Sequence, residues 1–218
     1  MKEKATAFIS ELSERLKADL PAFDAHKKVM AHRKPVDQLG ERIKSARQSA
    51  VLIFLYPHQS EWHTVFIQRT AYKGVHSGQI AFPGGKFELE DKSLEHTALR
   101  EAEEEVAIPA NRVNTIGRIS SLYVPPSNFL INPYIGYDLE RPEFKPEPTE
   151  VADIIEIPLE PLIGDHRLRD QKVRLSDGNV LNVKGFPVGD RLIWGATAMI
   201  LKEFADIVEE LKSPISLR

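Results

Sequence analysis

The stretch that most constrains this chain runs from Ala81 to Ile108 and reads AFPGGKFELEDKSLEHTALREAEEEVAI. Near its start, Pro83 is followed by two glycines, which is typical of a strand that ends in a tight turn. The residues from about Ser93 onward are good helix formers, and Ile108 precedes a proline, a position that disfavours helical backbone. The stretch therefore predicts a turn, a short acidic loop and one helix.

The predicted helix carries several carboxylates on one side. Glu101, Glu104 and Glu105 are separated by three or four residues and share a face, whereas Glu103 points away from it. One interpretation is an ordinary solvated face, because like charges at this spacing cost only about 0.2–0.5 kcal/mol per pair. The other is a site for a hard divalent cation, since such ions prefer carboxylate and carbonyl oxygens.

Composition bounds the class of protein. A length of 218 residues suggests one large domain, or one domain with a sizeable extension. The formal net charge of -3 argues against nucleic acid as the main partner, because binding to a phosphate backbone requires a basic surface. The chain contains no cysteine, which excludes disulfides and favours a cytoplasmic location. No apolar run has the length of a membrane span, so we expect no membrane association.

The remaining sequence predicts helices at both ends and strands between them. An amphipathic helix is predicted over 3–20 and a final helix over 195–211. The basic segment 24–35 is interpreted as a solvated loop, with contact to an anionic substrate as the alternative. Strands are predicted over 49–55, 63–68, 80–82, 112–121, 130–137 and 151–157, a hairpin over 172–188, and loops over 122–128 and 141–149. This order indicates a mixed sheet covered by helices on both faces.

The acidic helix and the turn before it together resemble a known motif. Gly85, the pair Arg100-Glu101 and the pair Glu104-Glu105 match the order of the Nudix box, G-x5-E-x7-R-E-U-x-E-E-x-G-U, in which U is a bulky aliphatic residue. The chain thus resembles the Nudix hydrolases.

The box also departs from that pattern in its loop and at its end. Asp91 replaces the loop glutamate, and eight residues rather than seven separate it from Arg100. The small Ala102 follows the first motif glutamate, and Ala107 stands where the pattern has a late glycine. The loop partner of Arg100 therefore stays open between Asp91 and Glu88.

The resemblance implies a fold and a set of functional residues. It implies an α/β fold, the Nudix-type α/β/α sandwich with a mixed sheet, in which 1–47 form an N-terminal helical extension and 48–218 the Nudix domain, with the box at about 85–108. It further implies Mg²⁺ or Mn²⁺ bound by the carboxylates of Glu101, Glu104 and Glu105 and the carbonyl of Gly85. Arg100 would orient the box. Such a site would hydrolyse a diphosphate linkage.

The segment before the box narrows the resemblance. FIQRTAYKGVHSGQIAFPGG is similar to the pattern R-[ST]-x-x-L-x-x-H-x-G-Q-[IV]-A-F-P-G-G of the coenzyme A branch of Nudix hydrolases, although the leucine position differs. This implies cleavage of coenzyme A or acyl-coenzyme A into (acyl-)4′-phosphopantetheine and adenosine 3′,5′-bisphosphate. Arg69 and His76 would bind the substrate, Arg69 through its planar guanidinium.

Several questions stay open at this level. Family members take the general base from the box or from a later loop, and here Glu150 and Glu147 are the candidates. Rival functions are hydrolysis of ADP-ribose or another nucleoside diphosphate derivative, and a non-enzymatic nucleotide-binding regulatory module. The expected partner is a small nucleotide-containing molecule. The sequence does not determine the oligomeric state, and a homodimer is one of the possibilities.

Overall fold

The structure, a computed structural model, describes residues 2–30, 34–71, 78–174 and 178–217. Its larger sheet contains β1 (Arg47–His58), β2 (Glu61–Arg69), β3 (Ile80–Ala81), β4 (Gly84–Lys86), β5 (Asn114–Arg118), β6 (Leu122–Val124), β7 (Phe129–Tyr137) and β8 (Val151–Pro158). Its order is β3-β2-β1-β7-β5, with β4 paired to β1, β6 to β7 and β8 to β2. Because β1 and β7 are parallel and the other pairs antiparallel, the sheet is mixed, as predicted.

Helices and a second sheet surround this larger sheet. The α-helices are α1 (Lys2–Arg15), α2 (Ala22–Val29), α3 (Glu41–Lys44), α4 (Leu94–Val106) and α5 (Gly195–Glu209). Short 3₁₀ helices cover η1 (Val36–Leu39), η2 (Ala110–Arg112), η3 (Glu160–Leu162) and η4 (Asp165–Arg167). The smaller antiparallel sheet contains β9 (Arg169–Arg174), β10 (Val180–Val188) and β11 (Arg191–Trp194) in the order β11-β10-β9.

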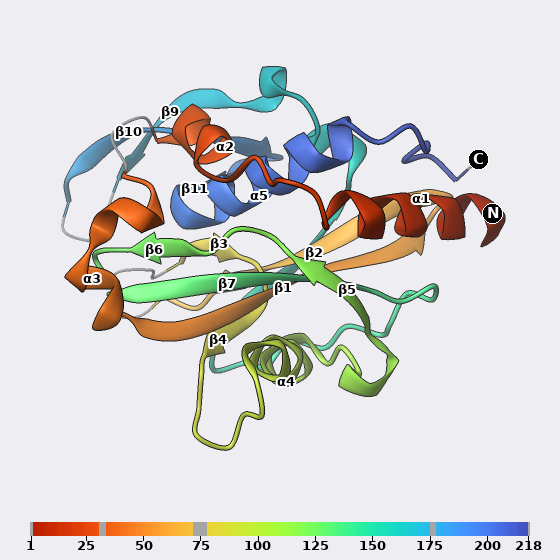
Figure 1. Ribbon diagram of the computed structural model, residues 1–218, viewed down its shortest axis with the longest axis horizontal. Helices are drawn as coiled ribbons and strands as arrows, with labels where there is room; N and C mark the ends of the chain where they lie inside the picture. Colours follow the sequence, from red (N-terminus) through yellow and green to blue (C-terminus); the bar gives the residue numbers. More distant parts are fainter. Residues whose placement is uncertain (1, 31–33, 72–77, 175–177, 218) are drawn as a thin grey trace.

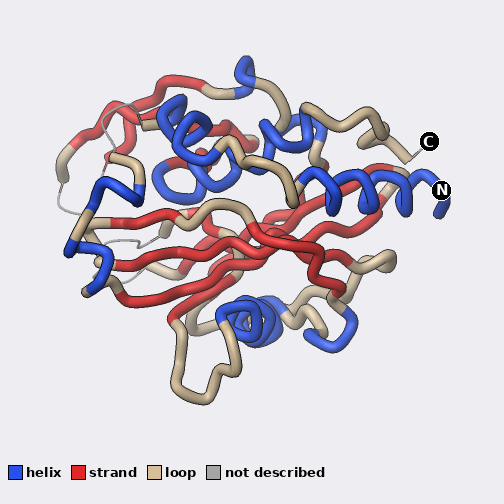
Figure 2. The backbone as a smooth tube through the Cα atoms, in the orientation of Figure 1, coloured by secondary structure: helices blue, strands red, loops and turns tan. Residues whose placement is uncertain are grey.

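The larger sheet lies between two helical layers. Figure 1 shows α4 on one face and α1, α2 and α5 on the other, and the tube in Figure 2 shows the same three layers. β1 is buried on both faces because its side chains alternate between two hydrophobic clusters: Leu52 and Phe54 pack with α4, whereas Ile53 and Leu55 pack with α1 and α5. This explains its almost continuous apolar sequence and confirms the predicted α/β class.

The N-terminal segment differs from its prediction. α1 ends at Arg15 rather than near residue 20, and Leu20, which precedes a proline and is disfavoured in a helix, lies outside it. The Arg15 side chain instead donates to the carbonyl of Asp19 at 2.9 Å and to the carboxylate of Glu210 at 2.6 Å. The chain then forms α2 within the segment predicted as a basic loop.

Two basic residues of α2, His26 and Lys28, contact acidic residues of α5 and η4. His26 is buried, and its Nε2 donates to Glu203 at 2.9 Å. Lys28 forms ion pairs of 3.2 Å with both Asp165 and Asp206. None of the described residues of 24–35 lines the cavity described below, and contact of this segment with an anionic substrate stays a prediction.

The buried charged residues of α5 have ionic or hydrogen-bonding partners. Lys202 is 0% exposed and forms ion pairs with Asp206 and, at 2.6 Å, with Asp165. Glu203 is also 0% exposed, and besides His26 it accepts the backbone N–H groups of Ala22 and Ser120 at 3.2 and 3.1 Å. These contacts attach the N-terminal helices to the rest of the molecule.

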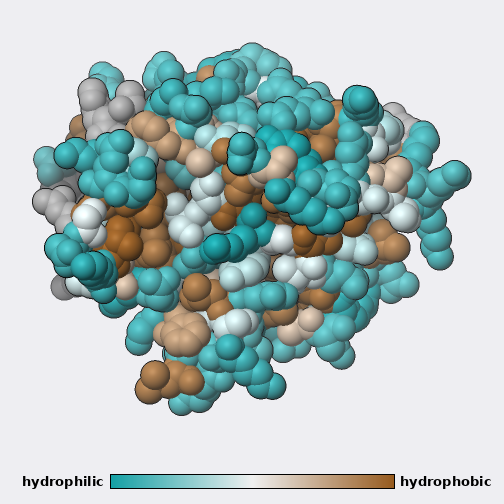
Figure 3. All heavy atoms as spheres, viewed as in Figure 1, coloured by the Kyte–Doolittle hydropathy of each residue, from teal (hydrophilic) through white to brown (hydrophobic). Residues whose placement is uncertain are grey.

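Strands β6 and β11 are among the elements that the sequence analysis did not predict. Residues 122–124 were predicted as loop but form β6, which pairs with the start of β7, so that only the following residues turn. β11 extends the predicted hairpin into a third strand. On the face shown in Figure 3 the surface is mostly hydrophilic, and the apolar group at its lower edge lies over the loop between β4 and α4, where Leu89 is 96% exposed.

Candidate active site

Gly84 and Gly85, which were predicted as a tight turn, form strand β4, where close contacts restrict the residue types. β4 pairs with β1, placing Gly84 opposite Val51 and Gly85 opposite Ala50. A Cβ atom at Gly84 would lie 2.3 Å from the carbonyl oxygen of Ala50, and its φ of +154° is also unfavourable for other residues. A Cβ atom at Gly85 would lie 2.4 Å from the carboxylate of Glu101. Gly84 is therefore required for the close approach of β4 to β1, and Gly85 leaves room for the Glu101 carboxylate of α4.

The ends of α4 are formed by local signals. The Ser93 side chain accepts the backbone N–H of His96 at 3.1 Å, which is the usual cap of a helix N-terminus. Ala107 ends the helix in the left-handed region, with φ 58° and ψ 35°. Glycine adopts this backbone conformation most easily, which explains why the motif usually has glycine here. Ala107 adopts the same conformation at that position.

Asp91 holds the acidic loop and the helix together. Its buried carboxylate accepts five hydrogen bonds of 2.9–3.1 Å from the Glu88 backbone and the side chains of His96, Thr97 and Arg100, the last through two nitrogens. The Arg100 guanidinium in particular holds the pKa of Asp91 well below its usual range. Asp91, and not the Glu88 side chain, is thus the loop partner of Arg100.

Glu105 is a buried carboxylate with few compensating partners. It is 2% exposed, accepts the Gly84 backbone N–H at 2.8 Å and lies 3.4 Å from Arg69 Nη1. Burial raises its pKa to about 8, the nearby charges of Glu101 and Glu150 act in the same direction, and the Gly84 and Arg69 contacts oppose the shift. A cation placed next to this buried carboxylate would therefore stabilise its ionised form.

The other two predicted ligands on α4 differ from each other. Glu101 lies over Gly85, its side chain is 14% exposed, and burial raises its pKa. Glu104 has a side chain that is 58% exposed and pairs with Arg100 at 2.9 Å. The predicted carboxylate face is therefore divided, with Glu101 and Glu105 directed into the cavity and Glu104 toward solvent. Within the described part of the chain, no three Asp, Glu, His or Cys side chains are grouped closely enough to enclose a metal ion.

The two candidates for the general base occupy different positions. Glu150 is exposed at the cavity wall. The Glu147 carboxylate accepts hydrogen bonds from Thr149 Oγ1 at 2.5 Å and from the backbone N–H groups of Thr149 and Glu150 at 2.9 and 3.1 Å. Thr70 clamps the same segment, because its backbone N–H donates to the Glu150 carbonyl at 2.9 Å. The geometry thus leaves the Glu150 carboxylate at the cavity and uses the Glu147 carboxylate to shape the loop.

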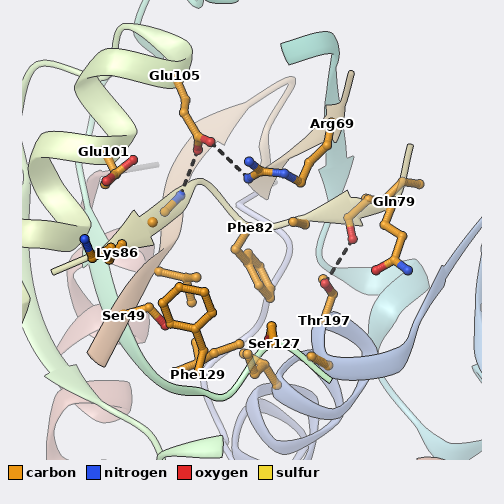
Figure 4. A pocket seen from close by; sticks show the side chains of 18 of the residues that line it. Ser49, Arg69, Gln79, Phe82, Lys86, Glu101, Glu105, Ser127, Phe129 and Thr197 are labelled. Carbon is orange, nitrogen blue, oxygen red and sulfur yellow. Dashed lines mark hydrogen bonds and ion pairs between the residues drawn. The ribbon is translucent and has the colours of Figure 1, made fainter. Parts of the chain in front are cut away.

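These residues line one end of a cavity of about 370 Å³. Figure 4 shows Glu101 and Glu105 extending from α4 and Arg69 approaching Glu105 from the end of β2. The opposite end is largely apolar and is formed by the start of β7, the β3 segment and the first turns of α5. Its lining residues include Ile80, Phe82, Phe129, Ile131, Thr197 and Ile200.

Sequence reasoning missed most of the apolar end. Phe129 and the residues of α5 lie far from the motif in the chain and reach the cavity through the pairing of β7 with β1 and the packing of α5 on the sheet. The sequence carries no local spacing that would reveal this. His76, predicted to bind substrate, lies outside the described residues.

Comparison with known proteins defines the class. The NUDIX domain family matches residues 46–175. The chain is 35% identical over 180 residues to the uncharacterized Nudix hydrolase NudL of Yersinia enterocolitica, covering 78% of this chain and 86% of that protein. It is 33% identical over 172 residues to the NudL of Pectobacterium atrosepticum, with 75% and 83% covered. A MutT/nudix family protein from Enterococcus faecalis shares the fold, with a TM-score of 0.51, 13% identity and coverage of 92% and 79%.

The chain belongs to the Nudix family. It is a Nudix hydrolase, an enzyme for the diphosphate linkage of a nucleoside diphosphate derivative, which confirms the predicted family and its enzymatic character. Enzymes of this family use divalent metal ions. Among the described residues, no helix combines the length and apolar character needed to cross a membrane.

Proposed function

We propose that this enzyme hydrolyses the diphosphate of coenzyme A or acyl-coenzyme A, giving (acyl-)4′-phosphopantetheine and adenosine 3′,5′-bisphosphate. The observation that carries the proposal is the position of Arg69. This residue matches the first position of the coenzyme A branch pattern, and its guanidinium lies at the carboxylate end of the cavity, 3.4 Å from Glu105. A planar guanidinium there suits the non-bridging oxygens of a diphosphate.

The residues present fit a divalent cation, for which we propose Mg²⁺ or Mn²⁺. The absence of a side chain at Gly85 leaves the space next to the Glu101 carboxylate that a Cβ atom would fill, and the donors there are hard oxygens. Glu101, Glu105 and the Gly85 carbonyl would hold the metal, and Glu104 remains a predicted further ligand. When bound, the metal supplies charge neutralisation at phosphate and acidifies water.

The roles of the protein groups follow from their positions. Glu150 would accept a proton from the attacking water, whose oxygen forms a bond to phosphorus as the bond to the bridging oxygen breaks. The leaving phosphate takes the electron pair of that bond. Arg69 would orient the non-bridging oxygens, and Arg100, tied to Asp91, would hold α4 against β4.

A product assay tests this proposal. Coenzyme A, acetyl-coenzyme A, ADP-ribose and NADH are each incubated with the enzyme and either Mg²⁺ or Mn²⁺, and products are separated by chromatography. We expect adenosine 3′,5′-bisphosphate and phosphopantetheine as the main products, with a higher kcat/KM for coenzyme A than for ADP-ribose. A higher kcat/KM for ADP-ribose or NADH would overturn the substrate assignment. Arg69→Ala should lower kcat/KM for coenzyme A and leave metal binding intact.

Three broader features of the proposal concern the protein as a whole. We propose a functional boundary near residue 47, where β1 begins, so that 1–47 form an extension to the domain at 48–218. The partner would be a small nucleotide-containing molecule in the cytoplasm. Retention of Glu101, Glu104 and Glu105 favours catalysis over a purely regulatory nucleotide-binding role.

A further inference from the structure

Phe129, the first residue of β7, is not used by the hydrophobic core. It belongs to neither hydrophobic cluster, and it is not among the partly buried apolar residues that pack against either cluster. Its half-buried side chain lines the cavity, where Figure 4 shows it below Phe82 and beside Ser127. By contrast, Phe82 is 2% exposed and its ring lies 4.5 Å from the ring of Phe66. Phe129 therefore offers an apolar aromatic surface within the cavity.

One face of the Phe129 ring is covered by a cation. The guanidinium carbon of Arg47 lies 4.1 Å from the ring centroid, and its Nη2 donates to the Ser127 carbonyl at 2.7 Å. Phe129 lines the cavity and Arg47 does not, so the ring contributes cavity surface while one of its faces is covered by Arg47. A guanidinium on one face draws electron density from the ring, which favours stacking of an electron-rich flat ligand on the opposite face.

The distance to the carboxylate end suits a nucleotide. Gly85 pairs with Ala50 in β1, and Phe129 pairs with Arg47, three residues earlier in the same strand. At 3.3 Å per residue, this places the backbone of Phe129 roughly 10 Å from that of Gly85 along the strand direction. A nucleoside separates its diphosphate from its base by a distance of this order.

We propose that Phe129, backed by Arg47, is the stacking platform for the adenine base of the substrate. The proposal rests on the proposed function in one respect: the diphosphate binds near Glu101, Glu105 and Arg69. It does not depend on which adenine-containing substrate is hydrolysed. A flexible pantetheine arm would gain only contact area from the ring, whereas a purine would also gain from the cation-backed π face.

Binding of ADP and of 4′-phosphopantetheine to variants of the full chain tests the platform. Both ligands are titrated by calorimetry in the presence of Mg²⁺. Phe129→Leu keeps an apolar side chain but removes the π face, and we expect the Kd for ADP to rise about tenfold, with the Kd for 4′-phosphopantetheine unchanged. Phe129→Trp should retain ADP affinity, and Arg47→Met should weaken ADP binding by a smaller factor.

A second phenylalanine provides the matched control. Phe144 has the guanidinium of Arg141 at 5.3 Å from its ring centroid but does not line the cavity, so Phe144→Leu should leave ADP affinity unchanged. Unchanged ADP affinity in Phe129→Leu, or a loss confined to 4′-phosphopantetheine, would overturn the proposal. ADP binding that depends on Phe129 in an enzyme inactive toward coenzyme A would support the platform and reject the coenzyme A assignment.

Discussion

Helices α4 and α5 lie on opposite faces of the same sheet (Figure 1). Both helices bury charged side chains, but the number of partners that balance each buried charge differs between them. On α5, Lys202 and Glu203 are fully buried, and ionic or hydrogen-bonding partners surround both. On α4, Glu105 is almost as deeply buried but has one backbone N–H and a single long contact to Arg69.

This difference separates structural from functional charge. A buried charge with its partners in place holds elements together, and removing one partner leaves the other uncompensated. A buried carboxylate with too few partners has a raised pKa and is available to a cation or substrate, as is common at active sites. Substitutions on α5 should therefore affect stability, and those at the cavity side of α4 should affect catalysis.

The largest expected effect is on catalysis at Glu105. Glu105→Gln should lower kcat by about 10²–10³-fold, since the amide cannot supply the carboxylate oxygens proposed to hold the metal, and Glu101→Gln should behave alike. Thermal unfolding should show a folded protein, because the amide is easier to bury than the carboxylate. Glu103→Gln, on the exposed side of the same helix, is the matched control and should leave kcat within about twofold. An equal loss in Glu103→Gln would contradict the assignment of the two sides.

The corresponding substitution on α5 should give the opposite result. Glu203→Gln removes a charge that accepts three hydrogen bonds, and we expect the free energy of unfolding to fall by about 2–3 kcal/mol. At temperatures where the variant is folded, kcat should stay within about twofold of the native value. Denaturant titration and steady-state kinetics check this. A lower kcat with an unchanged free energy of unfolding would contradict a structural role for the buried charge on α5.

Asp91 should show structural behaviour within the box itself. We expect Asp91→Asn to lower the free energy of unfolding at pH 7 by about 2 kcal/mol, through loss of charged hydrogen bonds. Hydrogen bonding from Arg100 lowers the pKa of Asp91 in the folded state below the unfolded value of about 3.9. Its stabilising contribution is thus present above about pH 4 and lost as pH falls further. Denaturation curves of both proteins should converge at low pH, and a constant difference would reject the cause.

A smaller effect is expected at Glu147, which shapes the loop that carries Glu150. Glu147→Ala should lower kcat about tenfold, or about 1.4 kcal/mol, with KM little changed, because the Glu150 carboxylate loses its fixed position. Stability should change by less than about 1 kcal/mol at this surface site. Glu150→Gln should lower kcat further than Glu147→Ala does. A larger loss of kcat in Glu147→Ala than in Glu150→Gln would make Glu147 the base.

The smallest expected effect is stabilisation by metal without substrate. Mg²⁺ at millimolar concentration should raise the free energy of unfolding by about 1 kcal/mol, or a few degrees in Tm, because it binds the folded state. Sodium chloride at equal ionic strength is the control for screening. The Glu101→Gln/Glu105→Gln double variant should lose the Mg²⁺ effect. An equal rise with sodium, or a retained rise in the double variant, would place the stabilising ion elsewhere.

Local spacing determined the acidic helix and the family of this protein, whereas the predicted turn at the two glycines is strand β4. The glycines, the Ser93 cap and the Arg100-Glu101 pair lie within one stretch of chain, where backbone geometry sets which residues are neighbours. The same spacing placed Asp91 within reach of Arg100 but left Glu88 as an alternative, which the hydrogen bonds decided in favour of Asp91. Predictions of this kind succeed because few distant contacts enter them.

Tertiary structure alone decided which charges reach the cavity and which serve the core. Glu104 has the same helical spacing as Glu101 and Glu105, yet it pairs with Arg100 in solvent, because strand β4 at Gly84-Gly85 covers only the other side of α4. His26 and Lys28 of α2 contact carboxylates of α5 that lie about 180 residues away in the chain. The Phe129 ring reached the cavity through the pairing of β7 with β1. Burial and charge compensation depend on such distant contacts, which spacing along the chain does not encode.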